Sequence, residues 1–230
     1  MAIILHIETA TKNCSVALAC DGKCLFSKLS QDGPSHASRL GVFVDEALQY
    51  AKANNLSLDA VAVSFGPGSY TGLRIGVSMA KGLCYALDIP LIAVPTLDIL
   101  AQAALPAPEG SFICPMIEAR RMEVYTRLYD SGGKALGEVQ AMVVNEDSFS
   151  NLPPEAVLII LGDGSDKCLP LIKKDHLQHK EVVLQAEWMI QPALEAYKAK
   201  RFEDVAYCEP FYLKEFQATI PTKLQQIINA

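Results

Sequence analysis

The order of the predicted strands and helices constrains this fold more than any single motif. The chain opens with an apolar run, Ile3–Thr9, which predicts a buried strand. Two more strand-like runs follow in "CSVALACDGKCLFSKL", on either side of Asp21-Gly22, a dipeptide typical of a tight hairpin turn. Three strands therefore precede the first helix. A simple Rossmann fold alternates strands and helices from its start, so this order favours a mixed sheet.

The remaining elements continue with helices and then repeat the strand-rich pattern. A helix is predicted over 36–54, followed by a strand, a second helix to about Leu87, another strand and a short helix from Thr96. The stretch Pro106–Ser111 is typical of a linker. Beyond it, hairpin and strand signals recur up to the short run "EVVLQ" (181–185), and a last helix follows.

Two such sets predict an α/β chain of two lobes with mixed sheets. We place the N-terminal lobe at 1–105 and the C-terminal lobe at 106–209. A C-terminal segment, 210–230, is expected to return to the N-terminal lobe. The length of 230 residues suits two lobes of this size.

The charge and cysteine content exclude several classes of protein. Acidic residues outnumber basic ones by 26 to 20, whereas a chain that grips a nucleic-acid backbone by itself normally has a basic surplus. No apolar run approaches the ~20 residues that span a bilayer, so we expect no membrane segment. Seven scattered cysteines, an odd number, indicate reduced thiols, and we expect a cytoplasmic location.

The stretch "SFGPGSYTGLRIG" (64–76) joins a predicted strand to a predicted helix through a glycine loop. Such junctions often hold phosphate, because free N–H groups and the helix dipole favour an anion. This string lacks the lysine of a Walker A loop, and Thr71 stands where a dinucleotide loop has its third glycine. The loop therefore gives weak support for a phosphate site.

Helix packing explains more of these glycines than phosphate binding does. Gly72, Gly76 and Ala80 lie four residues apart, so one face of the helix is nearly bare backbone. A glycine inside a helix costs about 0.5–1 kcal/mol relative to alanine, which a close contact would offset. The contacting element is either another part of this chain or a partner, and the sequence leaves both open.

Several strings resemble the bacterial TsaB (YeaZ) family: "ILHIETATKNCSVAL", "GPGSYTGLRIGVSMAKGL", "IPLIAVPTLDILA", "EARRMEVYTRLYD" and "EPFYL". The resemblance spans the chain in order and is densest up to about Ala101. It implies a two-lobe actin-like (ASKHA, ribonuclease H-like) fold. It also implies a role in forming threonylcarbamoyladenosine at position 37 of tRNAs that read ANN codons. The family is similar to TsaD, the threonylcarbamoyltransferase, and was once labelled glycoprotease (peptidase M22-like).

The metal motif of TsaD has no counterpart in this sequence. By the resemblance, Thr96 and Leu100 stand where TsaD has two histidines, and neither replaces imidazole as a transition-metal ligand. We expect other roles for the histidines present, with His6 packed on its strand and His36 exposed at the start of a helix. A metallopeptidase is therefore disfavoured, and we expect no metal and no cofactor.

A second hypothesis is an actin-like small-molecule kinase or ATPase. It predicts a weak nucleotide site between the lobes, contacted by Glu8, Thr9, Gly66 and Gly68. Actin-like ATPases have an aspartate and a glycine on the first hairpin. This chain has Glu8 and Ala10 there, and the methyl group of Ala10 would crowd a phosphate. No serine or cysteine has the flanking sequence of a nucleophile elbow, and no catalytic residue is predicted.

The first hypothesis is a non-catalytic scaffold that holds a TsaD-like enzyme. The resemblance implies contact through the helices over 36–54 and 70–87, and a homodimer through the same surface. It also implies that a TsaE-like ATPase joins, that a TsaC-type enzyme supplies threonylcarbamoyl-adenylate, and that tRNA is held indirectly through the complex. The alternative is that the apolar residues of these helices pack on their own sheet. We expect the partner interface to comprise Leu40, Phe43, Val44, Gly72, Ile75, Gly76, Met79, Ala80 and Leu83.

Overall fold

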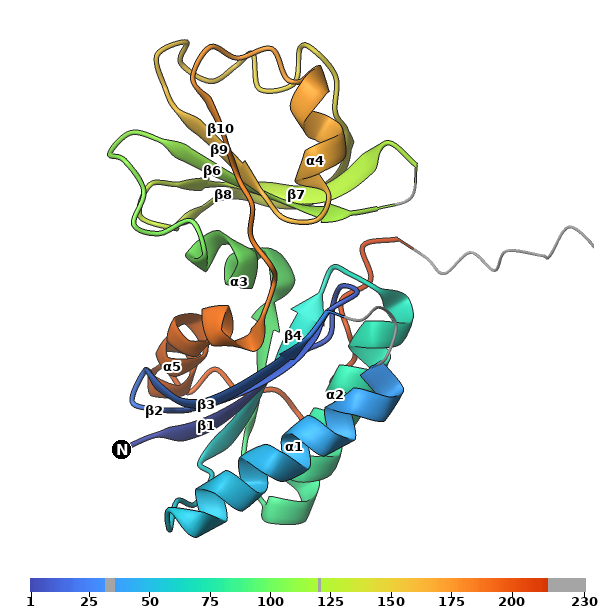
Figure 1. The fold of residues 1–230 in the computed structure, drawn as a ribbon, viewed down its shortest axis with the longest axis vertical. Helices are drawn as coiled ribbons and strands as arrows, with labels where there is room; N and C mark the ends of the chain where they lie inside the picture. The colour runs from blue at the N-terminus through green and yellow to red at the C-terminus, as the bar shows by residue number, and fades with distance from the viewer. Residues whose placement is uncertain (32–35, 120, 215–230) are drawn as a thin grey trace, which may run out of the picture.

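The computed structural model describes residues 1–31, 36–119 and 121–214, which form two lobes, one above the other in Figure 1. Each lobe is built on a five-stranded sheet. The strands of the first sheet are β1 (Ile3–Glu8), β2 (Cys14–Cys20), β3 (Lys23–Ser30), β4 (Ala60–Gly66) and β5 (Leu91–Pro95). Those of the second are β6 (Phe112–Glu118), β7 (Glu123–Asp130), β8 (Ala135–Val143), β9 (Leu158–Leu161) and β10 (Leu177–Lys180).

The two sheets have the same strand order, β3-β2-β1-β4-β5 in the first lobe and β8-β7-β6-β9-β10 in the second. In each sheet the first three strands pair antiparallel and the other two join in parallel. The predicted hairpin is confirmed, and Asp21 and Gly22 form its turn with positive φ. The fold is the predicted α/β, two-lobe, actin-like fold with ribonuclease H-like sheets.

Two helices of 18 residues each, α1 (His36–Ala53) and α2 (Tyr70–Leu87), cover one face of the first sheet (Figure 1). Alternate apolar side chains of β1, β2 and β4 point toward them and form one core cluster. The apolar residues spaced three and four apart in these helices meet that cluster, because such residues share one helix face.

Side-chain and backbone caps set the bounds of α2. The Ser69 hydroxyl accepts a hydrogen bond from Gly72 N (3.2 Å) at the start of the helix. Asp88 ends it in a left-handed conformation (φ 53°), with its backbone N–H donating to Cys84 O. The glycine loop therefore leads directly into a capped helix, as the sequence predicts.

The second lobe places shorter helices on the corresponding face of its sheet. α4 (Ser165–Cys168) has four residues and continues into the 3-10 helix η1 (Leu169–Leu171). Turns over 145–156 fill the rest of this face, and their apolar residues complete a smaller core cluster. The two lobes thus share a sheet topology but differ in the helical layer that covers it.

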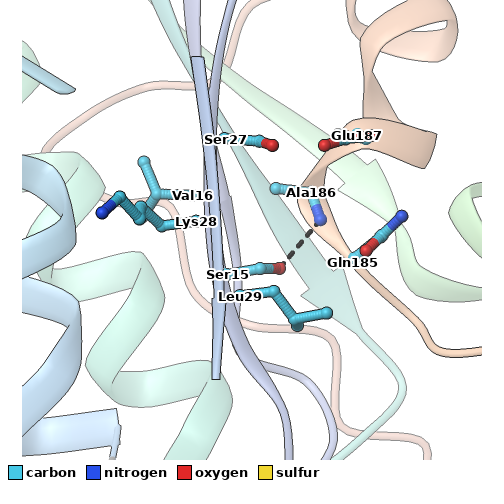
Figure 2. A pocket seen from close by; sticks show the side chains of 8 residues that line it. All are labelled: Ser15, Val16, Ser27, Lys28, Leu29, Gln185, Ala186 and Glu187. Atoms are coloured by element: carbon cyan, nitrogen blue, oxygen red, sulfur yellow. Dashed lines mark hydrogen bonds between the residues drawn. The ribbon is translucent and has the colours of Figure 1, made fainter. Parts of the chain in front are cut away.

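The chain returns to the first lobe earlier than predicted, directly after β10 rather than at 209. The 3-10 helix η2 (Ala186–Met189) and α5 (Ile190–Lys198) pack on the second face of the first sheet. Figure 2 shows the contact, in which Ala186 N donates a hydrogen bond to the Ser15 hydroxyl (2.8 Å). The predicted boundary at 209 is therefore wrong, because residues of the supposed C-terminal lobe are bonded to β2.

The strand predicted over 181–185 is also wrong. That run crosses between the lobes, and the edge strand β10 lies just before it, paired in parallel with β9. Farther along, Glu203 N donates to Leu91 O (2.9 Å), and Phe211 N donates to Phe65 O (2.8 Å). Phe211 and Tyr212 therefore lie on the first lobe, Lys214 reaches Glu123 of the second, and 215–230 of the predicted segment lie outside the described residues.

A core shared by both lobes lies around α3 (Thr96–Gln102), which Figure 1 shows between the two sheets. Polar contacts reinforce it: the Tyr129 hydroxyl on β7 donates to Asp98 Oδ1 on α3 (2.5 Å). The Lys180 ammonium donates to Ala103 O (2.6 Å). The lobes are therefore joined by packing as well as by the chain.

All seven cysteines are free thiols, and five of them are buried. Burial raises the pKa of Cys14 and Cys84 to about 11, so these two thiols stay protonated near neutral pH. Among the described residues, no helix has both the length and the apolar character needed to cross a membrane.

Candidate functional site

The glycine loop between β4 and α2 is packed against other parts of the same chain. A Cβ atom on Gly66 would lie closer than 3.0 Å to the carbonyl oxygen of Phe211, and one on Gly68 to that of Ala10. Gly66 also has a φ of 118°, a conformation that side chains rarely adopt. The loop thus receives backbone of this chain where a phosphate-binding loop would receive its ligand.

The two inward glycines of α2 are packed in the same way. A Cβ atom on Gly72 would lie closer than 3.0 Å to the carbonyl oxygen of Thr9, and one on Gly76 to the Thr9 hydroxyl. That hydroxyl donates a hydrogen bond to Gly72 O (2.8 Å). The bare face inferred from the glycine spacing therefore turns inward, onto the turn that follows β1.

This packing corrects the predicted nucleotide contacts. Glu8 and Thr9 are fully buried and Gly66 is buried, so these three residues cannot touch a ligand in this structure. Gly68 lines the cleft between the lobes. Ala10, expected to crowd a phosphate, is buried beside Gly68, and its carbonyl accepts a hydrogen bond from Ser69 N (2.6 Å).

Glu8 ends β1 with its carboxyl group inside the protein. Its Oε1 accepts a hydrogen bond from Ala10 N (2.6 Å), and the Ser64 hydroxyl of β4 faces the same carboxyl group. Burial raises the pKa of Glu8 to about 7, and the negative charge of Asp163 in the second lobe adds to the effect. Glu8 therefore holds the backbone of Ala10 inside the protein, and its pKa is well above that of an ordinary glutamate.

The two histidines considered in the sequence are both buried. His6 packs on its strand as predicted, with Nδ1 3.3 Å from Ala17 O, and burial lowers its pKa to about 4. His36 corrects the prediction of an exposed side chain, since it is 7% exposed. Its Nε2 donates to Thr11 O (2.8 Å), because the first turn of α1 lies across the turn between β1 and β2.

Thr96 and Leu100, which the resemblance aligns with two histidines of TsaD, both make structural contacts inside the protein. Thr96 is fully buried, and its hydroxyl accepts a hydrogen bond from Gly66 N (3.1 Å). Leu100 lies in the shared core. Within the described part of the chain, no group of three His, Cys, Asp or Glu side chains is arranged to hold a metal ion.

A serine, a histidine and an aspartate meet in the second lobe, outside the sites predicted from the sequence. The Ser165 hydroxyl donates to Gly162 O (2.6 Å) and lies 2.9 Å from His179 Nε2. Asp166 Oδ1 lies 3.2 Å from the same ring nitrogen. A catalytic triad uses the two different nitrogens of the ring, so this group ties β10 to α4 and does not activate the serine.

Six of the nine residues predicted for a partner interface are buried within the chain, which corrects the prediction for them. They are Leu40, Phe43, Val44, Gly72, Gly76 and Ala80. Apolar spacing in a helix marks the face that meets its own sheet, and these positions belong to that face. The other three, Ile75, Met79 and Leu83, are half-buried at its edge.

The accessible surface of α1 and α2 lies beside these buried positions. Among the described residues, a Cβ atom on Gly41 or Gly82 would have no neighbour within 4 Å, and Val42 is 53% exposed. Gly82 is three residues from Met79 and seven from Ile75, so the three share one side of α2. We call this surface the α1–α2 face, which comprises Ala37, Gly41, Val42, Ile75, Met79, Gly82 and Leu83.

Sequence reasoning missed Gly41 and Val42. Both lie out of phase with the buried residues of α1, and this phase was the signal that could have found them. Gly82 lies in the same helix as Gly72 and Gly76 but outside their four-residue spacing, so that spacing did not identify it.

A cleft of about 1570 Å³ separates the lobes, on the side of the molecule where α2 begins. Its walls include Gly68 and Tyr70 of the first lobe and Tyr125 of the second. Ala37 and Ile75 also line it, so the cleft continues into the α1–α2 face. The smaller space drawn in Figure 2, between β2, β3 and η2, has about 10 Å³ and is too small for anything larger than one water.

The chain is similar in sequence and in structure to proteins named for threonylcarbamoyladenosine biosynthesis and to YeaZ. A family model for TsaD, the tRNA N6-adenosine threonylcarbamoyltransferase, matches residues 31–158. The TsaB protein of Escherichia coli, named for tRNA threonylcarbamoyladenosine biosynthesis, is 32% identical over 220 residues, which cover 92% of this chain and 94% of that protein. The TsaB protein of Bacillus subtilis is 35% identical over 136 residues, 59% of this chain and 58% of that one. The structure of YeaZ from Pseudomonas aeruginosa is similar with a TM-score of 0.78 and 28% sequence identity, covering 93% of this chain and 100% of that chain.

Proposed function

Given that this chain belongs to the TsaB family, we propose that it is a non-catalytic scaffold in the biosynthesis of threonylcarbamoyladenosine on tRNA. In this role it binds and supports a TsaD-like enzyme, which performs the transfer at position 37 of tRNAs that read ANN codons. The observation that carries the proposal is the pair of helical glycines, Gly41 and Gly82, where an added Cβ atom would meet nothing within 4 Å in the part of the chain that the structure describes.

The two kinds of helical glycine in this lobe differ in what they contact. A glycine inside a helix costs about 0.5–1 kcal/mol relative to alanine. At Gly72 and Gly76 that cost is offset by close packing on Thr9. At Gly41 and Gly82 no such close packing is found within residues 1–31, 36–119 and 121–214, and a closely approaching backbone of a partner would offset the cost.

The side chains around these glycines suit a protein interface. Val42 is exposed, and Ile75 and Met79 are half-buried next to the open backbone. Interfaces bury apolar residues of this kind at their centre, and they gain most from close packing. The partner is a TsaD-like chain, and by the family resemblance the same face joins two copies of this chain.

The remaining parts of the molecule support a subunit that leaves chemistry to its partner. Glu8, Thr9 and Gly66 are buried, and by the resemblance Thr96 and Leu100 stand at the TsaD metal positions. The net charge of −6 suits a chain that is not the main contact with tRNA. A TsaE-like ATPase joins through the complex.

The test is complex formation, measured by size-exclusion chromatography with light scattering. The chain is mixed with the TsaD-like protein of the same organism, as wild type and as Gly82→Leu. The new side chain enters open space in the free chain and improves helix propensity by about 0.5–1 kcal/mol, so the monomer stays folded. Gly76→Leu is unsuitable, because its side chain would collide with Thr9.

Glu195→Leu is the matched control, since it adds the same side chain to an exposed position of α5, on the other side of the sheet. We expect a heterodimer with wild type and with Glu195→Leu, and none with Gly82→Leu. Equal binding by all three variants would move the interface away from the α1–α2 face. The absence of any complex with the wild-type chain would overturn the scaffold function and return the ATPase or kinase alternative.

A further inference from the structure

Two tyrosines near the C-terminal end of α2 stand almost fully in water. Tyr85, on α2 itself, is 85% exposed, and Tyr207, in the segment after α5, is 84% exposed. They are the two most exposed aromatic side chains in the part of the chain that the structure describes. Large aromatic side chains contribute much of the energy of protein interfaces, so their full exposure calls for a reason.

One lysine places both tyrosines on the same side of the molecule. The Lys81 ammonium donates hydrogen bonds to the carbonyl oxygens of Ala206 (3.1 Å) and Cys208 (3.0 Å), on either side of the second tyrosine. Tyr85 follows Lys81 by four residues, so the two share one side of α2. We call this surface the Tyr85–Tyr207 patch. Single exposed apolar residues are ordinary, whereas neighbouring aromatic ones indicate an interaction site.

The turn that carries Tyr207 is braced by its own hydrogen bonds. Asp204 Oδ1 accepts them from Ala206 N (2.8 Å) and Tyr207 N (3.2 Å), and Asp204 O accepts one from Cys208 N (2.8 Å). Val205 and Cys208 of the same turn pack on the core of the first lobe. The turn therefore directs its tyrosine outward from a fixed backbone, and a partner that binds it has little loop to order.

The Tyr85–Tyr207 patch continues the α1–α2 face. Tyr85 follows Gly82 by three residues, so the two are neighbours on the outer surface of α2. One turn of a helix advances about 5.4 Å, whereas a helix with its side chains is about 10–12 Å wide. A partner helix that packs closely on Gly82 therefore also covers Tyr85.

Carboxylates lie beside the patch. Asp88 ends α2, three residues beyond the first tyrosine. Burial raises the pKa of the Cys208 thiol to about 11, and the nearby negative charges of Glu203 and Asp204 add to the effect. Carboxylates and the faces of tyrosine rings both attract a cation, so their combination suits a positively charged group.

The cations of this region are engaged in contacts of the chain itself. The Lys81 ammonium donates to two carbonyl oxygens of the turn. Lys200 and Arg201 belong to the end of α5, where their backbone N–H groups donate to Tyr197 O and Ala196 O on the second face of the sheet. A cation for the tyrosines is therefore one that a partner brings.

We propose that the Tyr85–Tyr207 patch is the aromatic part of the partner interface and binds an arginine- or lysine-bearing segment of the TsaD-like chain. The inference rests on the proposed function and extends its interface beyond the α1–α2 face. Close backbone packing at Gly82 sets how the partner approaches, and the tyrosine rings with their neighbouring carboxylates hold its cation.

The first experiment measures the affinity for the TsaD-like protein by isothermal titration calorimetry. We expect Tyr85→Ala and Tyr207→Ala each to weaken binding about tenfold, and the Tyr→Phe variants, which keep the ring, to stay within about threefold of wild type. Because both side chains are exposed, every variant should keep the melting temperature of wild type.

Phe202→Ala is the matched control. Phe202 is an aromatic residue of the same segment, 40% exposed, but it packs on Tyr197 of α5, with ring centroids 5.8 Å apart. Its removal should leave the affinity as in wild type. A loss equal to that of Tyr207→Ala would show that a loosened segment weakens binding, and would overturn the patch.

The second experiment tests the cation. Glu203→Gln should weaken binding about threefold and make the affinity less sensitive to salt between about 0.05 and 0.5 M, because salt screens charge attraction. Glu195→Gln, on α5, should bind as wild type at each salt concentration. Equal salt dependence in all three chains would overturn a cationic occupant.

The outcomes separate this inference from the scaffold function. Wild-type affinity of both tyrosine-to-alanine variants, with Gly82→Leu still unable to bind, overturns the patch and leaves the scaffold function standing. Weaker self-association with an unchanged affinity for the TsaD-like protein would make a second copy the occupant, which also overturns the proposal. If the wild-type chain does not bind the TsaD-like protein, the scaffold function and the patch fail together.

Discussion

The two lobes of this protein have the same sheet topology but different helical layers. Both sheets follow the same strand order, yet two helices of 18 residues cover the first and a helix of four residues covers part of the second. The first lobe therefore carries an extended helical surface, and the second lobe does not. The strand order is common to both lobes, and the helical layer that covers each sheet is what differs.

The same contrast appears at the strand ends that face the cleft. β1 ends in the buried Glu8, under a turn that packs on α2, and β6 ends in the exposed Glu118. Glu8 alternates with Ile7, which faces α1 and α2, so it shares the opposite face of β1 with Ile4. Burial there, with Asp163 of the second lobe nearby, raises the pKa of Glu8 to about 7.

Replacing a packed glycine in each lobe should give the largest difference. Gly72→Ala places a methyl group against the carbonyl oxygen of Thr9, and we expect a loss of about 3 kcal/mol in the free energy of unfolding. In Gly164→Ala the nearest atom is a methyl group of Val124, which can move, but the backbone atoms Glu118 N and Ile117 C lie at 3.0 Å, so the expected loss is about 2 kcal/mol. Urea unfolding measures both.

Gly82→Ala is the control for helix propensity in this comparison. It meets no neighbour, so it should stabilise the free chain by about 0.5–1 kcal/mol. Equal losses for Gly72→Ala and Gly164→Ala would mean that the first lobe is no more tightly packed than the second.

The pH dependence of stability should expose two opposing groups on β1. His6 has a lowered pKa, so its contribution is lost as the pH falls from 6.5 toward 4. Glu8 has a raised pKa, so its contribution is lost as the pH rises from 4.5 toward 7. Each change is about 3 kcal/mol, and the wild-type profile should be nearly flat between pH 4.5 and 6.5.

Glu8→Gln should remove the fall of unfolding free energy with pH that Glu8 causes, so that the rise caused by His6 becomes visible. Its stability should rise by about 3 kcal/mol from pH 4 to 6.5, and should exceed that of wild type by a similar amount at pH 8. Thermal unfolding across this pH range is the measurement. Glu118→Gln, at the equivalent end of β6, should retain the wild-type profile, and a steep wild-type profile would contradict the opposition of the two groups.

The contact between the lobes should give a smaller effect. Tyr129→Phe removes the hydrogen bond from β7 to Asp98 on α3, and we expect a loss of about 1–2 kcal/mol. Because both lobes share one core, the chain should still unfold in a single transition in calorimetry. Two separate transitions in the variant would show that the hydrogen bond, and not the shared core, joins the lobes.

The ion pair between Lys214 and Glu123, which connects the C-terminal segment to the second lobe, should contribute least to stability. The Lys214 ammonium pairs with Glu123 Oε2 (2.5 Å), but both side chains are partly exposed. Exposed ion pairs are worth about 0–1 kcal/mol, so Lys214→Met should change the melting temperature little at any salt concentration. A large destabilisation would give this segment a role in joining the lobes comparable to that of α3.

The strands of both sheets could be predicted because short stretches of neighbouring residues specify them. The hairpin turn at Asp21-Gly22 and the alternating apolar runs specify strands from neighbouring residues alone, and repetition of the pattern predicted the second sheet. The boundary at 209 failed because the chain crosses between lobes at Leu184 without a glycine, a proline or a change in composition. Nothing within that run specifies which sheet it joins.

The candidate site depends on contacts that sequence spacing cannot orient. The spacing of Gly72 and Gly76 correctly indicated a close approach, but helical phase does not say whether a face points inward or outward. The contact is Thr9, 63 residues before Gly72 in the chain. Gly72 and Gly76 lie against Thr9, whereas Gly82 has no comparable contact among the described residues. Only the structure distinguishes Gly82 from the other two helical glycines.

The most direct test of the central claim is the rate of threonylcarbamoyl transfer to tRNA by the TsaD-like enzyme, with threonylcarbamoyl-adenylate as the donor. We predict that this chain raises the rate, that Gly82→Leu does not, and that the chain alone transfers nothing. Glu195→Leu should act as wild type. Transfer by the chain alone, or equal stimulation by Gly82→Leu, would contradict a non-catalytic scaffold that acts through the α1–α2 face.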